Sequence, residues 1–188
     1  MEATLQKQNE TRSRTRDLAN FIKMRPAIPG DDLQVADLVL RTFVSTYEKK
    51  LPDVRTTEGR KDELRDVATR RRNGFVGVAE LGYQIIGTFA LIHPESTMSE
   101  AWHSNGATLR CVAIDPDFHG LALSELLLNE ADRVAKLWRA DAIFLHVQKG
   151  AEKVAAIYTK HGYRRDPIGD KISFDCELEG YRKSIHAS

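Results

Sequence analysis

Apolar and polar positions become periodic only after the first twenty residues, which are mostly polar and contain no apolar block. Phe21 to Arg25 alternate apolar and basic residues, and Pro26 to Gly30 follow as a turn. A helical stripe begins near Leu33, where Asp31 and Asp32 can cap it. The stripe is formed by Val35, Leu38, Val39, Thr42 and Phe43.

A strongly charged segment follows from Tyr47 to Asn73. Its pattern predicts a second helix from about Arg60 to Arg72. The Arg70-Arg71-Arg72 cluster is interpreted as the solvated end of that helix, where cations complement the helix dipole. Acidic residues are interleaved with the basic ones, so the segment offers no continuous track for the phosphates of a nucleic acid.

The next apolar runs predict strands. Phe75 to Glu80 and Tyr83 to His93 are separated only by Leu81-Gly82, which favours an antiparallel hairpin. A loop from Pro94 to Gly106 follows. The elements expected after this loop are a strand from Ala107 to Ile114, a helix from about Leu123 to Trp138, a strand from Ala142 to Val147, a helix from Glu152 to His161 that stops at Gly162, and a final strand around Lys171 to Glu177.

The order of these elements indicates the fold class. Only residues 107 to 148 read as strand, helix and strand, the unit that returns a parallel strand to a sheet. We therefore predict an α+β fold with a mixed, mostly antiparallel sheet that is flanked by helices and has one parallel crossover at its centre. A chain of 188 residues with 41% hydrophobic residues suits one domain, here residues 21–188 after a polar N-terminal arm of residues 1–20.

Composition narrows the classes of partner. The net charge of +1, from 28 basic and 27 acidic residues, gives no global attraction to nucleic acid or to an anionic membrane. Cys111 and Cys176 lie far apart without metal-ligand spacing, which favours free thiols in a reducing compartment. No long apolar window or secretory signal is present, so a cytoplasmic protein is expected. Homodimerisation through the last strand stays open.

One segment carries a candidate chemistry. The strand Val112-Ala113-Ile114 breaks at Asp115-Pro116 and turns through residues 117–124 into a helix. Pro116 cannot continue a strand ladder, and Gly120 relaxes the backbone. The N–H groups that open a helix lack internal partners and attract anions. This segment therefore predicts a seat for a phosphate or pyrophosphate.

The same residues resemble the GNAT superfamily, the acetyl-CoA-dependent N-acetyltransferases. Members end the fourth strand with apolar-x-Pro and continue with Arg/Gln-x-x-Gly-x-Gly/Ala, and the corresponding segments here are Ile114-Asp115-Pro116 and His119-Gly120-Leu121-Ala122-Leu123-Ser124. A second family feature, an apolar-Tyr pair before Gly-aromatic, is matched by Ile157-Tyr158 and Gly162-Tyr163. His119, Ala122 and Ser124 depart from the usual loop residues, but their backbone N–H groups can still bind a phosphate.

The resemblance implies a sheet that is split at its centre between the strands that end at Ile114 and Val147. It further implies acetyl-CoA as co-substrate, no metal, and direct attack of a primary amine on the thioester. It also implies that a backbone N–H of the fourth strand polarises the thioester carbonyl and that Tyr158 protonates the CoA thiolate. The residues expected to bind the cofactor are Val112, Ala113, Ile114, His119, Gly120, Leu121, Ala122, Leu123 and Ser124.

The general base is left open. Relatives often carry Glu early in the fourth strand, but the aligned position here is near Thr108. Glu80, His93 and His146 are candidates, although His146 lies in an alternating strand and could instead be a core histidine. A relayed water, or an amine that arrives neutral, would need none of them.

The acceptor is also open. The resemblance places its pocket around Phe43, Tyr47 and the charged segment, opposite the loop from Pro94 to Gly106. Trp102 and His103 in that loop could contact the acceptor, or Trp102 could pack as a lid over the core. A small amine, an amino acid, a peptide N-terminus and a lysine side chain all remain candidates.

Two alternatives compete with an enzyme. A catalytically weak or inactive member of the family could bind CoA or a partner protein as a regulatory module. A dinucleotide-binding Rossmann domain would need an all-parallel sheet with a glycine fingerprint after its first strand. The antiparallel strands expected before the loop argue against that domain.

Overall fold

The protein is described by a computed structural model over residues 20–50, 56–119, 121–174 and 176–185, with the side chains of residues 45–50 left out. Residues 1–19 of the predicted N-terminal arm, Gly120 of the predicted loop and the Tyr47 side chain lie outside this description. Within the described residues, no helix is both long and apolar enough to cross a membrane.

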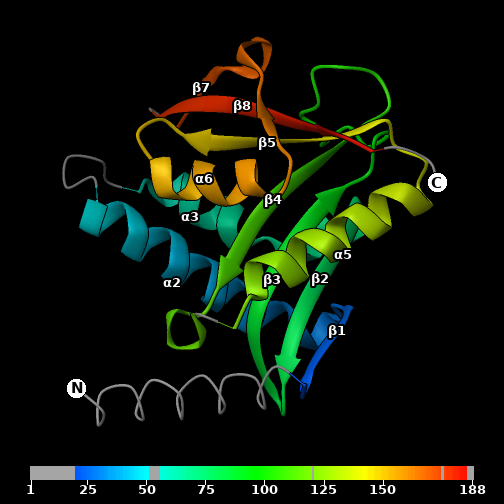
Figure 1. The fold of residues 1–188 in the computed structure, drawn as a ribbon. Helices are drawn as coiled ribbons and strands as arrows, with labels where there is room; N and C mark the ends of the chain where they lie inside the picture. The colour runs from blue at the N-terminus through cyan, green and yellow to red at the C-terminus, as the bar shows by residue number, and fades with distance from the viewer. Residues whose placement is uncertain (1–19, 51–55, 120, 175, 186–188) are drawn as a thin grey trace, which may run out of the picture.

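The strands of the described residues form one sheet in the order β1-β2-β3-β4-β5-β8-β6, with β7 also paired to β8 (Figure 1). Only β4 and β5 run parallel, and every other pair is antiparallel. This arrangement confirms the predicted fold class. The strands are β1 (Ile22–Pro26), β2 (Gly74–Leu81), β3 (Gln84–Ile92), β4 (Gly106–Ile114), β5 (Ala142–Gln148), β6 (Arg164–Arg165), β7 (Lys171–Ser173) and β8 (Cys176–Ser184).

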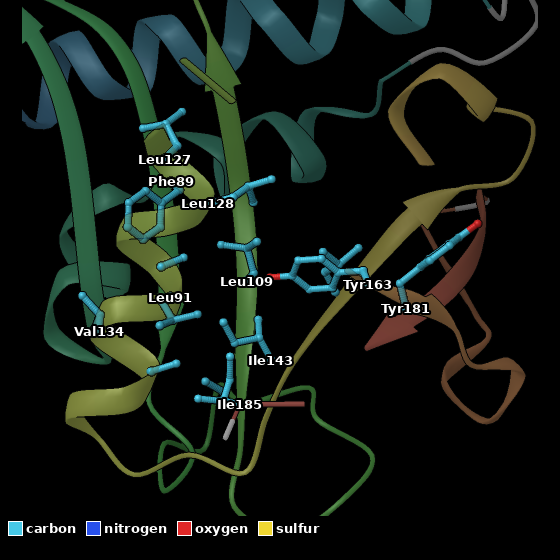
Figure 2. Packing of buried hydrophobic residues seen from close by; sticks show 14 of the residues in the cluster. Phe89, Leu91, Leu109, Leu127, Leu128, Val134, Ile143, Tyr163, Tyr181 and Ile185 are labelled. Atoms are coloured by element: carbon cyan, nitrogen blue, oxygen red, sulfur yellow. The ribbon is translucent and has the colours of Figure 1, made fainter. Parts of the chain in front are cut away.

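Helices cover both faces of the sheet (Figure 1). They are α2 (Asp32–Lys50), α3 (Glu58–Arg65), α4 (Val67–Arg72), α5 (Leu123–Leu137) and α6 (Glu152–Lys160). One core cluster joins α2, α3 and α4 to the sheet, through residues such as Val39, Leu64 and Val67. A larger cluster lies under α5 and is joined by α6 (Figure 2). It includes Phe89, Leu91, Leu109, Leu127, Leu128, Val134, Ile143 and Tyr163.

Most predicted elements are confirmed with small changes at their ends. The hairpin is β2 and β3, and Gly82 takes a positive φ of 64° in its turn, a conformation that suits glycine. The predicted strand, helix, strand and helix from residue 107 to residue 161 are β4, α5, β5 and α6. Residues of β2 alternate between the two faces of the sheet. Val76 and Val78 join one core cluster, whereas Ala79 joins the other.

The predicted single helix from Arg60 to Arg72 is wrong, because the chain breaks at Asp66. Asp66 has φ −76° and ψ 68°, ends α3 and caps α4 by accepting a hydrogen bond from the N–H of Thr69. The interpretation of the arginine cluster as a solvated end holds for exposed Arg72 but is wrong for Arg70 and Arg71. Arg70 is buried and donates to the carbonyl oxygens of Glu63 and Leu64, and Arg71 pairs with Asp32.

The end of the chain also differs from the prediction. The final strand expected around Lys171 to Glu177 is a short β7 followed by the longer β8. β8 pairs with β5 on one side and with β6 and β7 on the other. The last strand is therefore an interior strand of the sheet along its paired length, and not an open edge where a second copy could add a strand.

Candidate active site

The parallel pair at the centre of the sheet opens after three residue pairs. β4 and β5 are in register only from Gly106 opposite Ala142 to Thr108 opposite Phe144. Beyond this point a cavity lies between them, lined by Leu109 and Val112 of β4 and by Leu145 and His146 of β5. Tyr158 of α6, Phe43 of α2 and Arg60 of α3 also line it, so side chains from both faces of the sheet meet in one cavity. The predicted split between the two strands is confirmed.

A bulge shapes the β4 wall of this cavity. Two residues of β4, Cys111 and Val112, lie opposite the single residue Phe89 of β3. Cys111 has a positive φ of 52°, an uncommon conformation for a residue with a side chain. The bulge begins three residues after the last β4 residue that pairs with β5, Thr108, and a sequence pattern gives no sign of it.

The backbone after the bulge presents a donor to the cavity side. In an extended chain, successive N–H groups point to opposite sides. The N–H of Asp115 donates to the carbonyl of Ile86 in β3, at 2.9 Å. By this alternation the N–H of Ile114 points away from β3, toward the gap that β5 leaves open, whereas Val112 lies within the bulge, where the alternation is interrupted. Ala113 lies between them with its side chain buried in the core.

Tyr158 reaches the cavity from α6. Its ring packs edge-on against Tyr163, with 5.6 Å between ring centroids. Tyr163 in turn fills the space between β4 and β5 (Figure 2). Burial raises the pKa of the Tyr158 phenol above its usual value, and the nearby Cys111 thiol adds to this effect. Tyr158 therefore keeps its proton at any physiological pH.

The predicted phosphate seat lies at the start of α5. Ala122 is the N-cap residue, takes a left-handed φ of 53° and makes no side-chain capping hydrogen bond. The helix makes its first backbone bond from Leu126 N–H to Ala122 O, at 3.1 Å, so the N–H groups of residues 123–125 have no partner inside the helix. This open, positively polarised end is suited to an anion.

The other predicted loop residues take different places around this helix end. His119 ends a short 3-10 helix (Pro116–Phe118), its side chain is exposed, and its own N–H donates to Pro116 O. Leu121 and Ser124 are half-buried. Leu123 is buried in the core, so it can offer only its backbone to a ligand.

A carboxylate that sequence reasoning missed lines the cavity. The Glu100 side chain belongs to the loop before β4, and buried Thr108 holds this loop by accepting a hydrogen bond from Glu100 N–H at 2.9 Å. Thr108 is the position where the resemblance leads one to expect a glutamate. The protein therefore has a carboxylate in this region, supplied by the loop that Thr108 anchors.

Glu100 belongs to a cluster of charged side chains. Lys171 Nζ lies 2.9 Å from Glu100 Oε2, and Arg110 Nη1 lies 3.7 Å from Glu100 Oε1. Arg110 also donates to Glu63, at 2.8 Å, and Glu63 pairs with Arg60. Burial alone would raise the pKa of Glu100, but Arg110 and Lys171 outweigh it and the net pKa is lowered. Glu100 is therefore a stable anion at neutral pH.

His146 faces this cluster with one ring nitrogen. Its Nε2 lies 2.8 Å from the carbonyl oxygen of Gly169. A carbonyl can only accept, so Nε2 carries the proton and Nδ1 holds a free lone pair. Nδ1 lies 3.7 Å from Glu100 Oε2. Burial lowers the pKa of His146, and the charge of Lys171 lowers it further, so the imidazole is neutral at pH 7.

The other predicted base candidates lie elsewhere. Glu80 pairs with Arg25 at 2.7 Å, and the His93 ring packs against Trp138. Neither lines the cavity between β4 and β5. Trp102 packs against Phe144 and donates a hydrogen bond to Asp166 at 3.0 Å. Of the two roles expected for Trp102, the structure therefore favours packing over the core and not contact with the acceptor amine. No disulfide joins Cys111 and Cys176.

Close packing around Gly169 fixes the carbonyl that holds His146. A Cβ added at Gly169 would lie 2.5 Å from the Trp102 ring. We expect Gly169→Ala to cost about 1–3 kcal/mol, as overpacking does, and to lower Tm by roughly 2–4 °C for each kcal/mol. Thermal unfolding would measure this. Gly30→Ala is the matched control, because its new Cβ meets its nearest neighbour only at 4.0 Å, and its Tm should stay unchanged. Equal stabilities of the two variants would contradict the expected packing.

Comparison with known proteins identifies the family. The family model named Acetyltransferase (GNAT) family matches residues 34–163. The chain belongs to the GNAT acetyltransferase family. The predicted resemblance and the expectation of a GNAT-type acyltransferase are thereby confirmed. No curated protein matches the chain significantly.

Solved structures share the GNAT fold at low sequence identity. A GNAT acetyltransferase from Staphylococcus aureus Mu50 has a TM-score of 0.69 and 16% identity, over 88% of this chain and 99% of that one. PaiA N-acetyltransferase from Thermoplasma acidophilum, solved with coenzyme A, has a TM-score of 0.65 and 16% identity, over 87% and 98%. Spermidine N-acetyltransferase from Vibrio cholerae, solved with CoA and spermine, has a TM-score of 0.61 and 17% identity, over 88% and 96%.

Proposed function

We propose that this GNAT protein is an N-acetyltransferase that moves the acetyl group of acetyl-CoA to a primary amine by direct attack. One observation carries the proposal: Tyr158, the open N–H edge of β4 and the Glu100–His146 pair meet in a single cavity where β4 and β5 separate. A proton donor, a carbonyl-polarising donor and a proton acceptor are the three groups that such a transfer needs.

The start of α5 fits the pyrophosphate of the co-substrate. Ala122 has no side-chain oxygen that would occupy the helix N–H groups, so these remain available to an anion. The GNAT neighbour from Thermoplasma acidophilum was solved with coenzyme A, which supports the same ligand class here. Residues 121–124 would hold the phosphates, and acetyl-CoA supplies the activated thioester.

The β4 edge and Tyr158 would act on the thioester group. Val112 lines the cavity, and we assign its backbone N–H as the donor to the thioester. It would donate a hydrogen bond to the carbonyl oxygen as negative charge develops there. The C–S bond breaks as the bond from nitrogen to carbon forms, and the Tyr158 phenol gives its proton to the sulfur. The proton that the acetylated nitrogen then loses returns to the Tyr158 phenolate. Burial that raises the pKa of the phenol also raises that of a thiol beside it, which preserves the driving force for this transfer.

Glu100 and His146 would receive the amine. Two hydrogen-bond acceptors, Glu100 Oε2 and His146 Nδ1, face each other at 3.7 Å. An ammonium nitrogen has three donors and can bond to both. Glu100 would then hold the ammonium group and His146 Nδ1 would take its proton, because a neutral imidazole is the better base near pH 7.

A melting-temperature series tests the cofactor part of the proposal. Acetyl-CoA, CoA and adenosine diphosphate are added over a concentration range, since a ligand that binds only the native state raises Tm with the logarithm of its concentration. A saturable rise with both CoA compounds, and release of free thiol from acetyl-CoA when amines are added, is the expected result. Stabilisation without thiol release for any amine would favour the inactive CoA-binding alternative.

The loop substitution Ala122→Asp is expected to weaken CoA binding. Asp tolerates a left-handed φ, so the main change is a carboxylate beside the pyrophosphate. Two like charges about 5 Å apart in a partly hydrated site repel by about 2 kcal/mol, which corresponds to about a 30-fold loss of affinity. The asparagine of Ala122→Asn has the shape of aspartate without the charge, so this variant should lose much less affinity for CoA. Equal affinities for the Asp and Asn variants would place the pyrophosphate elsewhere.

A further inference from the structure

The charges that line the cavity do not balance. Among the described residues, its charged wall consists of Arg60, Arg110 and Lys171 against the single carboxylate Glu100. Glu63 pairs with Arg60 and Arg110 from behind that wall. Even when Glu63 is counted, three cations face two carboxylates. His146 adds no charge, because its imidazole is neutral.

Arg60 is the cation that retains most of its hydrogen-bonding capacity. Arg110 donates to Glu63 and lies close to Glu100, and Lys171 pairs with Glu100. Within the described part of the chain, only one N–H of the Arg60 guanidinium donates a hydrogen bond, to Glu63, although the group has five donors. Its exposed fraction is 23%, so it is neither fully buried nor simply solvated.

Aromatic rings hold the Arg60 guanidinium in place. Its central carbon lies 5.9 Å from the centroid of the Phe43 ring and 5.5 Å from that of Phe174. Both rings also line the cavity. A guanidinium that is fixed on ring faces presents its planar N–H fork as a preformed site for an oxyanion. Lysine could not provide this geometry.

We infer that the acceptor is a small amino carboxylate of the amino-acid type, with its amine at Glu100 and His146 and its carboxylate at Arg60. The inference rests on the proposed acetyltransferase function. When such a zwitterion binds, its carboxylate lies at the part of the wall with excess positive charge, and its ammonium group lies at the carboxylate of Glu100. A polyamine would bring only further positive charge into the same cavity, which is unfavourable once water is displaced.

Three acceptor pools test the inference: the twenty L-amino acids, their carboxamides, and simple amines with spermidine. Thiol release from acetyl-CoA is followed for each pool. We expect the rate of thiol release with the amino-acid pool to exceed the rates with the other two pools by about 10- to 100-fold. This is the range of effect expected when a charge-assisted hydrogen bond cannot form. Equal or greater rates with the amides or amines would overturn the inference and leave the acetyltransferase proposal standing.

Arg60 variants then test the proposed carboxylate contact with the best amino acid. Arg60→Gln should raise the KM for this amino acid at least about 10-fold. Arg60→Lys should give a KM between those of the wild type and Arg60→Gln. Arg65→Gln is the matched control, because Arg65 lies on the same helix, makes the same i,i+3 type of ion pair, with Asp62, and is exposed. An unchanged KM in Arg60→Gln would overturn the inference.

A binding measurement covers the case in which no pool releases thiol. That result would rule out these three classes of acceptor, and the same pools are then compared by their effect on Tm in the presence of CoA. Stabilisation by the amino-acid pool that is lost in Arg60→Gln would support the carboxylate site without catalysis. Equal shifts from all three pools, or no shift from any, would overturn the site as well.

Discussion

Tyr158→Phe is expected to lower kcat by at least about 100-fold, the usual range for loss of a positioned general acid. The ring lies in the cavity at the gap between β4 and β5, and phenylalanine keeps its packing against Tyr163. Only the proton donor to the departing thiolate is lost. The KM for acetyl-CoA should therefore change much less than kcat, because the removed contact is made in the transition state rather than in the bound substrate. Steady-state thiol release separates the two constants.

Tyr163→Phe is the matched control for this variant. Tyr163 lies next to Tyr158, is fully buried, and its hydroxyl has no hydrogen-bond partner among the described residues. Removing that hydroxyl should leave kcat unchanged and stability equal or slightly higher, because a buried unpaired polar group is unfavourable. If Tyr158→Phe retains full turnover, the role of Tyr158 as the acid is refuted, and the thiolate must leave unprotonated or take its proton from another donor.

Local pattern was sufficient to predict the elements that build the site. The strand before Pro116, the helix after it and the Tyr158 helix are each marked by periodic apolar residues and by a breaker, such as Gly162, which takes a φ of 92°. These features lie within a few residues of one another, where sequence and backbone geometry are directly linked. The parallel crossover followed from the order of the elements, whereas the gap at its centre was implied by the family resemblance.

Contacts between distant segments could not be predicted in the same way. Glu100 lies in an irregular loop, and it enters the cavity because Thr108 accepts the hydrogen bond of its N–H. Lys171 reaches Glu100 from β7, 71 positions along the chain. The break at Asp66 depended on capping geometry within a segment that looks uniformly helical by charge. Each of these depends on tertiary placement, which no single window of sequence contains.

His146→Gln is expected to produce the second large effect, a fall in kcat/KM of about 100-fold near neutral pH. Glutamine can keep a donor toward the Gly169 carbonyl, which His146 Nε2–H contacts at 2.8 Å, but it cannot accept a proton. The cavity should therefore remain in place while the acceptor ammonium loses its base. Activity would then depend on the small fraction of amine that is already neutral in solution.

The pH profile distinguishes a base from a structural histidine. Burial and the charge of Lys171 lower the pKa of His146, so the wild-type acid limb should fall below the ordinary histidine value of about 6.5. The neutral form is the active one, so kcat/KM rises with pH through this pKa and is level by pH 7. In His146→Gln the limb should move upward, toward the pKa of the amine. A purely structural role would lower activity at every pH without moving the limb. That outcome would refute His146 as the base and leave Glu100 or a bound water as the proton acceptor.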